Sequence, residues 1–176
     1  LEAVRIRQGQ REYVLECERL ACGYGLLPNT ELAQALGMAL SPEKAIAVDA
    51  WQASSLPHHF AAGECTGIGG CEKALAQGAI AGYAATGQTQ QAQGLWQERA
   101  RWEAFAAHVR QHLQADVAAV KHLLRPDTVV CRCEDVRHAD LAPRTGWIDA
   151  KLHTRCGMGP CQGRVCGAAT QFLFGW

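Results

Sequence analysis

The last third of the chain depends on residues 131–136, which read CRCEDV, and on residues 156–166, which read CGMGPCQGRVC. The first stretch supplies Cys131 and Cys133, and the second ends with Cys161 and Cys166. Two segments that each donate two thiolates suit a site with four sulfur ligands, the set that an iron–sulfur cluster requires. The spacing therefore favours an iron–sulfur cluster on these four cysteines.

The residues around the second cysteine pair suit a close approach of the backbone to a cluster. Gly157 and Gly159 have no Cβ atom, so the chain can pass near a ligand there. We expect a helix to start at Pro160 and Cys161, where free backbone N–H groups would hydrogen-bond sulfur and offset its negative charge. Three arginines near the ligands in sequence could also compensate this charge: Arg132, Arg155 and Arg164.

Two other uses of the same cysteines stay open. The chain has nine cysteines, which is many for its 176 residues. A structural zinc site is one alternative, although the single residue between Cys131 and Cys133 is fewer than zinc sites usually have. Disulfides are the other, although nothing in the sequence marks export.

The composition is that of a globular protein, with 48% hydrophobic and 19% charged residues. Its 17 basic and 17 acidic side chains cancel, so the chain lacks the broad positive field that nucleic acid or an anionic membrane requires. No apolar run reaches membrane-spanning length, and the amino terminus has no secretory pattern. The chain lacks an initiator Met and opens in a strand-like alternation, so we expect it to be part of a longer protein.

The pattern predicts an α+β fold in three parts. Residues 1–88 are expected to form an α/β fragment, 89–126 a helical linker, and 127–176 a small helical domain. Apolar residues recur at three- or four-residue steps from 90 to 124, which indicates an amphipathic helix or hairpin. Within the first part, the elements expected are β structure over 1–22, strands at 45–49 and 60–62, and helices at 30–36 and 71–85.

Residues 54–82 read SSLPHHFAAGECTGIGGCEKALAQGAIAG and contain a glycine loop before the expected helix. By itself such a loop is either a tight turn or a device that aims the positive end of the helix at a ligand. The run as a whole resembles the FAD-contacting segment of the pyridine nucleotide–disulfide reductase superfamily, with Ser54 in place of the usual Thr. An α/β flavoprotein fragment is therefore expected here.

This resemblance implies FAD contacts at Gly63, Glu64, Gly69 and Gly70. Glu64 would bind the flavin ribitol, and the backbone at Gly69 and Gly70 would face the flavin pyrimidine edge. No G-x-G-x-x-G motif follows a strand, so both dinucleotide phosphate loops of that superfamily are absent from the sequence. We therefore expect the remainder of a flavoprotein to complete the FAD site.

The sequence identifies no catalytic residue. His58, His59 and His153 have no partner that spacing reveals, and we interpret them as surface or loop residues. Cys65 and Cys71 flank the glycine loop, but we interpret them as small buried residues rather than a redox pair.

The cysteine module resembles the BFD-like [2Fe-2S] domain, named for bacterioferritin-associated ferredoxin, over about residues 129–172. The resemblance rests on CRCEDV and on TRCGMGPCQGRVC, which matches the T-R-x-G-M-G-x-C-Q-G-R-x-C signature of variants fused to flavoprotein dehydrogenases. It implies a helical fold and a [2Fe-2S] cluster on Cys131, Cys133, Cys161 and Cys166. Cys156 stands at a variable position of the signature and is interpreted as a non-ligand.

Together the two segments resemble the FAD subunits of heteromeric dehydrogenases, a group that includes hydrogen cyanide synthase, opine oxidase and proline or hydroxyproline dehydrogenases. This implies a small amino-acid or amine substrate, other dehydrogenase subunits as partners, and a cytoplasmic location, with peripheral attachment to the inner membrane face through those subunits as an alternative. The chain alone is not expected to turn over substrate. A stand-alone ferredoxin-like carrier and a zinc-stabilised interaction module are the competing functions.

Overall fold

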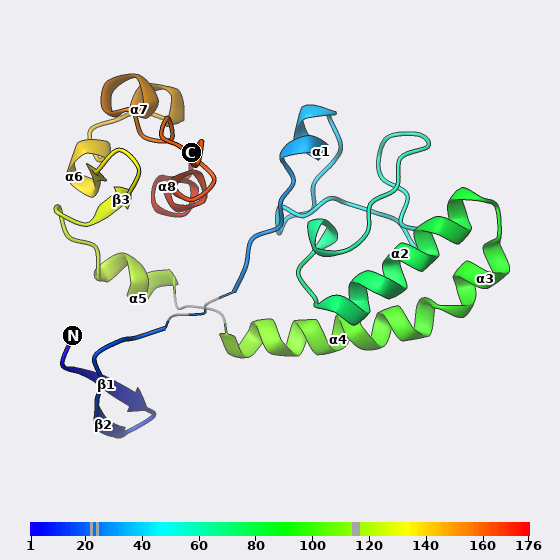
Figure 1. Cartoon of the computed structure of the whole chain (residues 1–176), viewed down its shortest axis with the longest axis horizontal. Coiled ribbons are helices and arrows are strands. Elements are labelled where there is room, and N and C mark those ends of the chain that lie inside the picture. The colour runs from blue at the N-terminus through cyan, green and yellow to red at the C-terminus, as the bar shows by residue number, and fades with distance from the viewer. Residues whose placement is uncertain (22, 24, 114–116) are drawn as a thin grey trace. The chain divides into compact units, whose positions relative to one another are not determined.

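The computed structural model describes residues 1–21, 23, 25–113 and 117–176. They fall into two compact units, residues 1–114 and 115–176, each with its own elements (Figure 1). The fold mixes helices and strands, as the sequence predicts. The stretch expected to be a helical linker contributes helices to both units.

The first unit opens with a β-hairpin. Strands β1 (Ala3–Gln8) and β2 (Arg11–Glu16) pair antiparallel, with Ala3 opposite Glu16 and Gln8 opposite Arg11. Gly9 has a φ of 60°, which a two-residue hairpin turn requires. The β structure predicted for the start of the chain is confirmed up to Glu16. It is wrong for residues 17–21, which form no strand, and position 22 lies outside the described residues.

A short helix and a looped segment follow. Helix α1 (Glu31–Ala35) ends before Gly37, close to its predicted bounds. The strands predicted at 45–49 and 60–62 are not continuous; this region holds isolated bridges such as Val48 with Ser54 and Ala53 with Phe60. Left-handed turns at Lys44, Gln52 and His58 (φ 63–65°) reverse the chain every few residues, which leaves no room for longer ladders. These turns bring Ala33, Ile46 and Ala61 into one small core.

Three helices complete the first unit. The 3-10 turn η1 (Glu64–Thr66) leads into α2 (Cys71–Ala85), which keeps its predicted bounds, and then into α3 (Thr89–Gly94) and α4 (Trp96–Leu113). Ile80 and Ala92 are fully buried where α2 meets the hairpin of α3 and α4 (Figure 1). Small side chains at this contact let the helix backbones approach closely.

The second unit wraps short elements around the cysteines. Its elements are α5 (Val117–His122), β3 (Val129–Cys131), β4 (Val136–Arg137), α6 (His138–Leu141), α7 (Trp147–Thr154) and α8 (Cys166–Phe174). The helix predicted to start at Pro160 starts instead at Cys166. Gln162 and Gly163 have left-handed φ values of 52° and 81°, so this segment forms turns before the helix begins.

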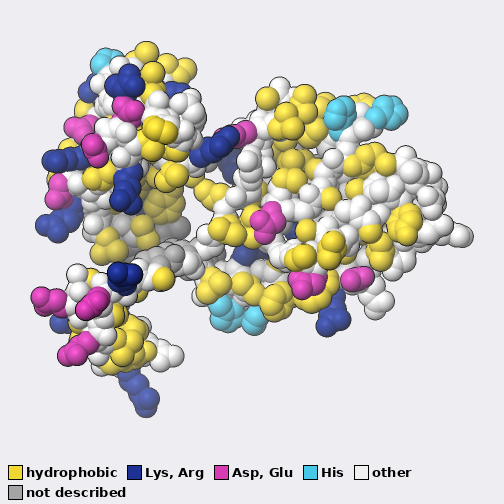
Figure 2. Space-filling view, in the orientation of Figure 1, with side chains coloured by type: hydrophobic (Ala, Val, Ile, Leu, Met, Phe, Trp, Pro, Cys, Tyr) yellow, Lys and Arg dark blue, Asp and Glu magenta, His cyan; other side chains and the backbone are white. Residues whose placement is uncertain are grey.

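The surface of both units carries mixed charge. In the view of Figure 2, Lys and Arg side chains lie among Asp and Glu side chains, in keeping with the balanced composition. None of the described helices combines the length and the apolar character needed to cross a membrane.

Candidate functional site

The second unit places all four predicted ligands in short structured segments. Cys131 ends strand β3, and Cys133 lies in the turn that leads to β4, where Asp135 has a left-handed φ of 53°. Cys161 lies in the turns after Pro160, and Cys166 opens α8. The two cysteine-bearing segments thus meet in one small domain.

The sulfur atoms form two groups. The Sγ atoms of Cys131, Cys156 and Cys166 all lie within 4.8 Å of one another, and these side chains are at most 1% exposed. Cys133 and Cys161 make a separate side-chain contact nearer the surface. The predicted ligands are therefore divided between a buried group and a surface pair.

Cys156 is a member of the buried group, although the sequence pattern predicts it to be a non-ligand. The only sequence signal for its place there is that it is a cysteine directly before the GMG motif. Its closeness to Cys131 and Cys166 gives the site five thiols in total. The assignment of Cys131, Cys133, Cys161 and Cys166 as metal ligands stays a prediction.

Neighbouring backbone N–H groups favour the thiolate form of two of the cysteines. Burial raises the pKa of the Cys131 thiol, but N–H donors from Gly157 and Glu134 outweigh burial, so this pKa lies below its ordinary value. The pKa of Cys161 is also lowered, first by the N–H of Val165 and then by the Cys133 side chain. Donors of this kind stabilise thiolates and cluster sulfur, so the residues present suit an iron–sulfur cluster.

The buried thiols of Cys156 and Cys166 instead favour the protonated form. Burial raises the pKa of Cys156 to about 11 and that of Cys166 to about 12. Burial therefore disfavours a thiolate at both positions, and a bound metal ion would offset that cost.

Glycines let the cysteine segments pack together. A Cβ atom on Gly159 would lie 2.3 Å from Cys133 Cβ, and one on Gly157 would lie 2.7 Å from the Trp147 ring. Both glycines therefore allow close packing of the protein itself, and their approach to a cluster stays a prediction. Of the predicted charge-compensating arginines, Arg155 pairs with a carboxylate, Glu134, at 2.8 Å.

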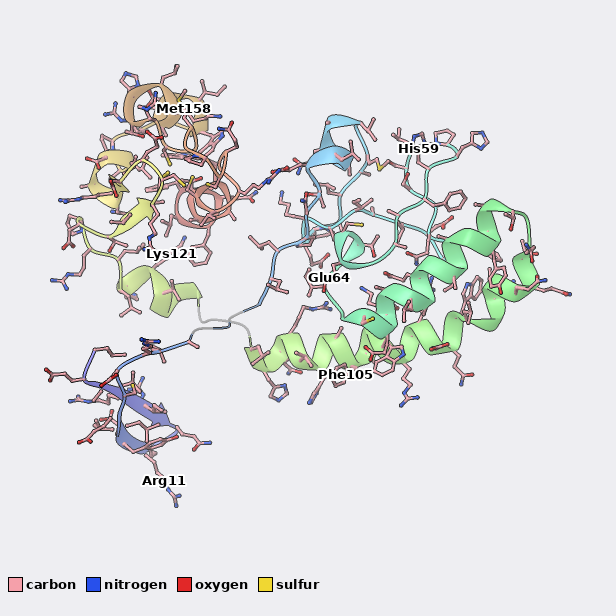
Figure 3. The ribbon with its side chains drawn as sticks, viewed as in Figure 1. Arg11, His59, Glu64, Phe105, Lys121 and Met158 are labelled. Carbon is pink, nitrogen blue, oxygen red and sulfur yellow. The ribbon has the colours of Figure 1, made fainter. Side chains whose placement is uncertain are left out.

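The first unit holds the predicted FAD contacts on a fixed turn. Gly63 has φ 85° and ψ −154°, and its N–H donates to Gln77 Oε1 at 2.9 Å. The Thr66 hydroxyl donates to Gly63 O at 2.8 Å and contacts Gln77 Oε1 at 3.0 Å. Glu64 opens the turn and is exposed (Figure 3).

Gln77 and Thr66 anchor this turn and were not among the predicted site residues. Gln77 is 2% exposed and lies on the inner face of α2. The sequence signal that could have found it is a single amide among the small and apolar residues of that helix.

The glycine loop of residues 67–70 lies against α2 and α4. Gly70 precedes α2 with a φ of 88°, and Gly67 has a φ of 123°, so both conformations favour glycine. Lys73 and Arg110 reach the loop carbonyls from the two helices. Neither cation was predicted to be part of the site.

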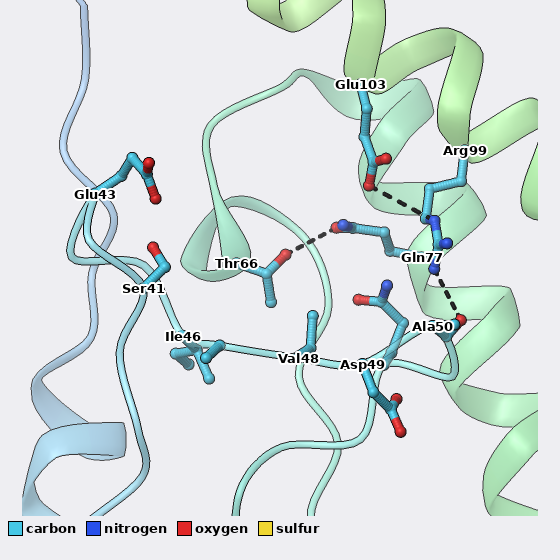
Figure 4. Close-up of a pocket in the computed structure, with 12 residues that line it drawn as sticks. Ser41, Glu43, Ile46, Val48, Asp49, Ala50, Thr66, Gln77, Arg99 and Glu103 are labelled. Atoms are coloured by element: carbon cyan, nitrogen blue, oxygen red, sulfur yellow. Dashed lines mark hydrogen bonds and ion pairs between the residues drawn. The ribbon is translucent and has the colours of Figure 1, made fainter.

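A separate open pocket of about 560 Å³ lies in the first unit between the 41–52 segment, α2 and α4 (Figure 4). Arg99 pairs with Glu103 at 3.6 Å and donates to Ala50 O at 2.8 Å. Gln77 and Thr66 line this pocket and also anchor the Gly63 turn, so the two features share both side chains.

Each of the remaining candidate side chains is either exposed or held by a neighbouring residue. His58 and His59 are exposed, and His153 pairs with Asp149 at 2.9 Å on α7. Cys65 packs against the small core, but Cys71 is exposed at the start of α2, so its predicted burial is wrong. The first turn of α2 leaves that position on the outer face of the helix.

Comparison with known proteins identifies the class. Residues 2–93, just over half of the chain, match the pyridine nucleotide-disulphide oxidoreductase family, and the chain belongs to that family. It is therefore part of an oxidoreductase, as predicted from the glycine-loop segment.

Two individual relatives are similar to most of this chain. The chain is 37% identical over 170 residues to hydrogen cyanide synthase subunit HcnB of Pseudomonas aeruginosa, covering 86% of this chain and 36% of that protein. It is 31% identical over 183 residues to an opine oxidase subunit of Rhizobium meliloti, covering 93% of this chain and 39% of that protein. The chain thus spans little more than a third of these relatives. No solved structure matches.

Proposed function

We propose that this chain is the electron-transfer part of an FAD-dependent dehydrogenase or oxidase that acts on an amino acid or a related amine. Electrons from FAD would leave through a [2Fe-2S] cluster on Cys131, Cys133, Cys161 and Cys166. The observation that carries the proposal is the meeting of the two cysteine segments in one small domain. Backbone N–H groups that lower the pKa of Cys131 and Cys161 support it.

Membership of the pyridine nucleotide-disulphide oxidoreductase family supports FAD as the second cofactor. The turn held by Gln77 presents Glu64 at an exposed position, where its carboxylate can accept hydrogen bonds from ligand hydroxyls. Because the sequence contains neither dinucleotide phosphate loop, other parts of the flavoprotein would bind the pyrophosphate.

The two cofactors would carry out different parts of the chemistry. When bound, FAD supplies two-electron chemistry and the cluster supplies single-electron transfer. The cysteines of this chain would hold iron as thiolates, and the N–H groups of Gly157 and Val165 would offset the negative charge on sulfur. Glu64 orients the flavin side chain, and the second unit shields the buried sulfurs from water.

The substrate class and the partners come from similarity. The relatives are named as subunits of hydrogen cyanide synthase and of opine oxidase. By analogy we propose an amino acid or amine as substrate and other dehydrogenase subunits as partners, in a cytoplasmic complex. This chain does not contain an identifiable general base, so substrate oxidation would depend on the rest of that complex.

One observation favours a second candidate. The three buried sulfurs of Cys131, Cys156 and Cys166 are close enough to bind a single ion, and a fourth thiol from the surface pair would complete a zinc site. A zinc-stabilised interaction module would then replace the redox role. A stand-alone ferredoxin-like carrier would keep the cluster but not the flavin.

The electron path can be tested in the complete flavoprotein, prepared anaerobically. We expect limited dithionite to reduce both FAD and a cluster with a [2Fe-2S] EPR signal. In Cys161→Ser, FAD should still bind and be reduced, but electron delivery to cytochrome c should fall at least about tenfold. An unchanged rate in Cys161→Ser would refute a path through the cluster.

A further inference from the structure

Two cations hold consecutive carbonyl groups of the glycine loop. Lys73 Nζ on α2 donates to Gly67 O at 2.8 Å. Arg110 Nη1 on α4 donates to Ile68 O at 3.1 Å. Two helices of the first unit thus fix the orientation of two successive peptide planes.

The fixed carbonyls determine where the loop N–H groups point. In a trans peptide the N–H is directed opposite to the preceding C=O, and the structure has no cis peptide among its described residues. With the oxygens of Gly67 and Ile68 turned toward the cations, the N–H groups of Ile68 and Gly69 face the other way. Within the described ranges, no acceptor is present for the N–H groups of Ile68, Gly69 or Gly70. The loop therefore presents three free donors.

Lys73 occupies a position that is unfavourable for a cation. It is 6% exposed and lies in the first turn of the 15-residue helix α2, where the helix dipole repels positive charge. Burial lowers its pKa, with Arg110 and Arg99 acting in the same direction and Glu103 opposing them. An apolar side chain would fill this space at a lower electrostatic cost, so packing alone does not explain a lysine here.

The loop and the lysine stem fit together. A Cβ atom on Gly69 would lie 2.3 Å from Lys73 Cδ and 3.4 Å from Ala106 Cβ. Glycine at position 69 is therefore what allows the loop to rest on the lysine stem. The loop that carries the N–H donors therefore packs directly on the Lys73 side chain.

We propose that Lys73 and Arg110 are positioning residues for the flavin. They hold the loop of residues 67–70 so that its free N–H groups meet acceptor atoms on the pyrimidine edge of the flavin. They also add positive charge beneath that edge, which favours the more electron-rich reduced flavin. This inference rests on the proposed FAD site and adds two residues, outside the glycine motif, that set its affinity and potential.

The test uses the complete flavoprotein with Lys73→Met, Lys73→Arg and Arg110→Met, and Lys44→Met as a matched charge control on the exposed surface of the same unit. Loss of a charged hydrogen bond should weaken FAD binding about tenfold or more in Lys73→Met, and a few-fold in Arg110→Met. The midpoint potential of bound FAD should become more negative in Lys73→Met and recover toward the unchanged value in Lys73→Arg.

FAD affinity and midpoint potential that match the Lys44→Met control in both Met variants would overturn the proposal. Arg110 is exposed, so its variant is expected to fold and keeps the test decisive if Lys73→Met does not fold. If the unchanged flavoprotein itself binds no FAD, the proposed function fails. The two failures are thereby distinguishable.

Discussion

Arg155 Nε donates to Glu134 Oε2 at 2.8 Å and so joins the two cysteine segments, because Glu134 follows Cys133 and Arg155 precedes Cys156. Arg155 has a left-handed φ of 62° at the end of α7, which directs the chain back toward the first segment. The ion pair therefore links the two cysteine-bearing segments of the candidate cluster site.

Arg155→Met should loosen this tie without removing a thiol. The Arg155 side chain is 62% exposed, so the pair is worth about 1 kcal/mol at most. We expect the cluster absorbance of the intact protein to decay up to about fivefold faster under a chelator. Arg125→Met is the control, because Arg125 makes an exposed 3.9 Å pair with Asp127 away from the cysteines. An equal rate of cluster loss in both variants would contradict a role of the Arg155–Glu134 pair in holding the cysteine segments together.

Gly159→Ala should disturb the cysteine turns by steric overlap. The new Cβ would overlap Cys133 Cβ, and overpacking of this kind costs about 1–3 kcal/mol. We expect lower iron content and a lower unfolding midpoint in the intact protein. Gly167→Ala is the matched control, since its Cβ would meet nothing within 4 Å and alanine favours the helix. Equal iron retention in the two variants would rule out the predicted overlap.

Thiol reactivity in metal-free protein should separate the two cysteine groups. Cys161 has a lowered pKa and is partly exposed, whereas Cys156 is buried with a pKa of about 11. Because the thiolate is the nucleophile, iodoacetamide should label Cys161 first at neutral pH. Labelling of Cys156 should increase as the pH rises toward its pKa, about tenfold for each pH unit. Peptide mass spectrometry measures both rates, and similar labelling at neutral pH would contradict this order.

Gln77→Leu should loosen the turn that carries Glu64. It removes the acceptor for the partly buried Gly63 N–H, and such a donor left without a partner costs up to about 3 kcal/mol. Urea unfolding of the intact flavoprotein measures the loss, and FAD binding should weaken with it. Gln93→Leu on the exposed surface of α3 is the control, and a Gln77→Leu protein as stable as this control would disprove the anchoring role.

The sequence predicts the elements whose signals are local. The helix at residues 71–85 follows from its small, helix-favouring residues and the glycine before it, and its bounds are confirmed. The hairpin at the start follows from alternation around Gly9. The oxidoreductase family of the first half is confirmed from the run that includes Gly63 and Glu64.

Features that depend on tertiary contact could not be predicted in the same way. Lys73 and Gln77 become site residues only because the loop folds back over α2, a contact that periodicity does not encode. Gln162 adopts a left-handed φ that residue type does not announce, which delays the helix start to Cys166. Cys156, between the left-handed residues Arg155 and Gly157, joins the buried sulfurs.

The metal content of the anaerobically prepared protein tests the central claim most directly. Iron, acid-labile sulfide and zinc are measured together, with an EPR spectrum after dithionite reduction, for the unchanged protein and for Cys161→Ser. The cluster assignment predicts iron and sulfide in equal amounts and a [2Fe-2S]-type signal that Cys161→Ser loses. Zinc alone, with no signal after iron–sulfur reconstitution, would contradict it and leave a structural metal module.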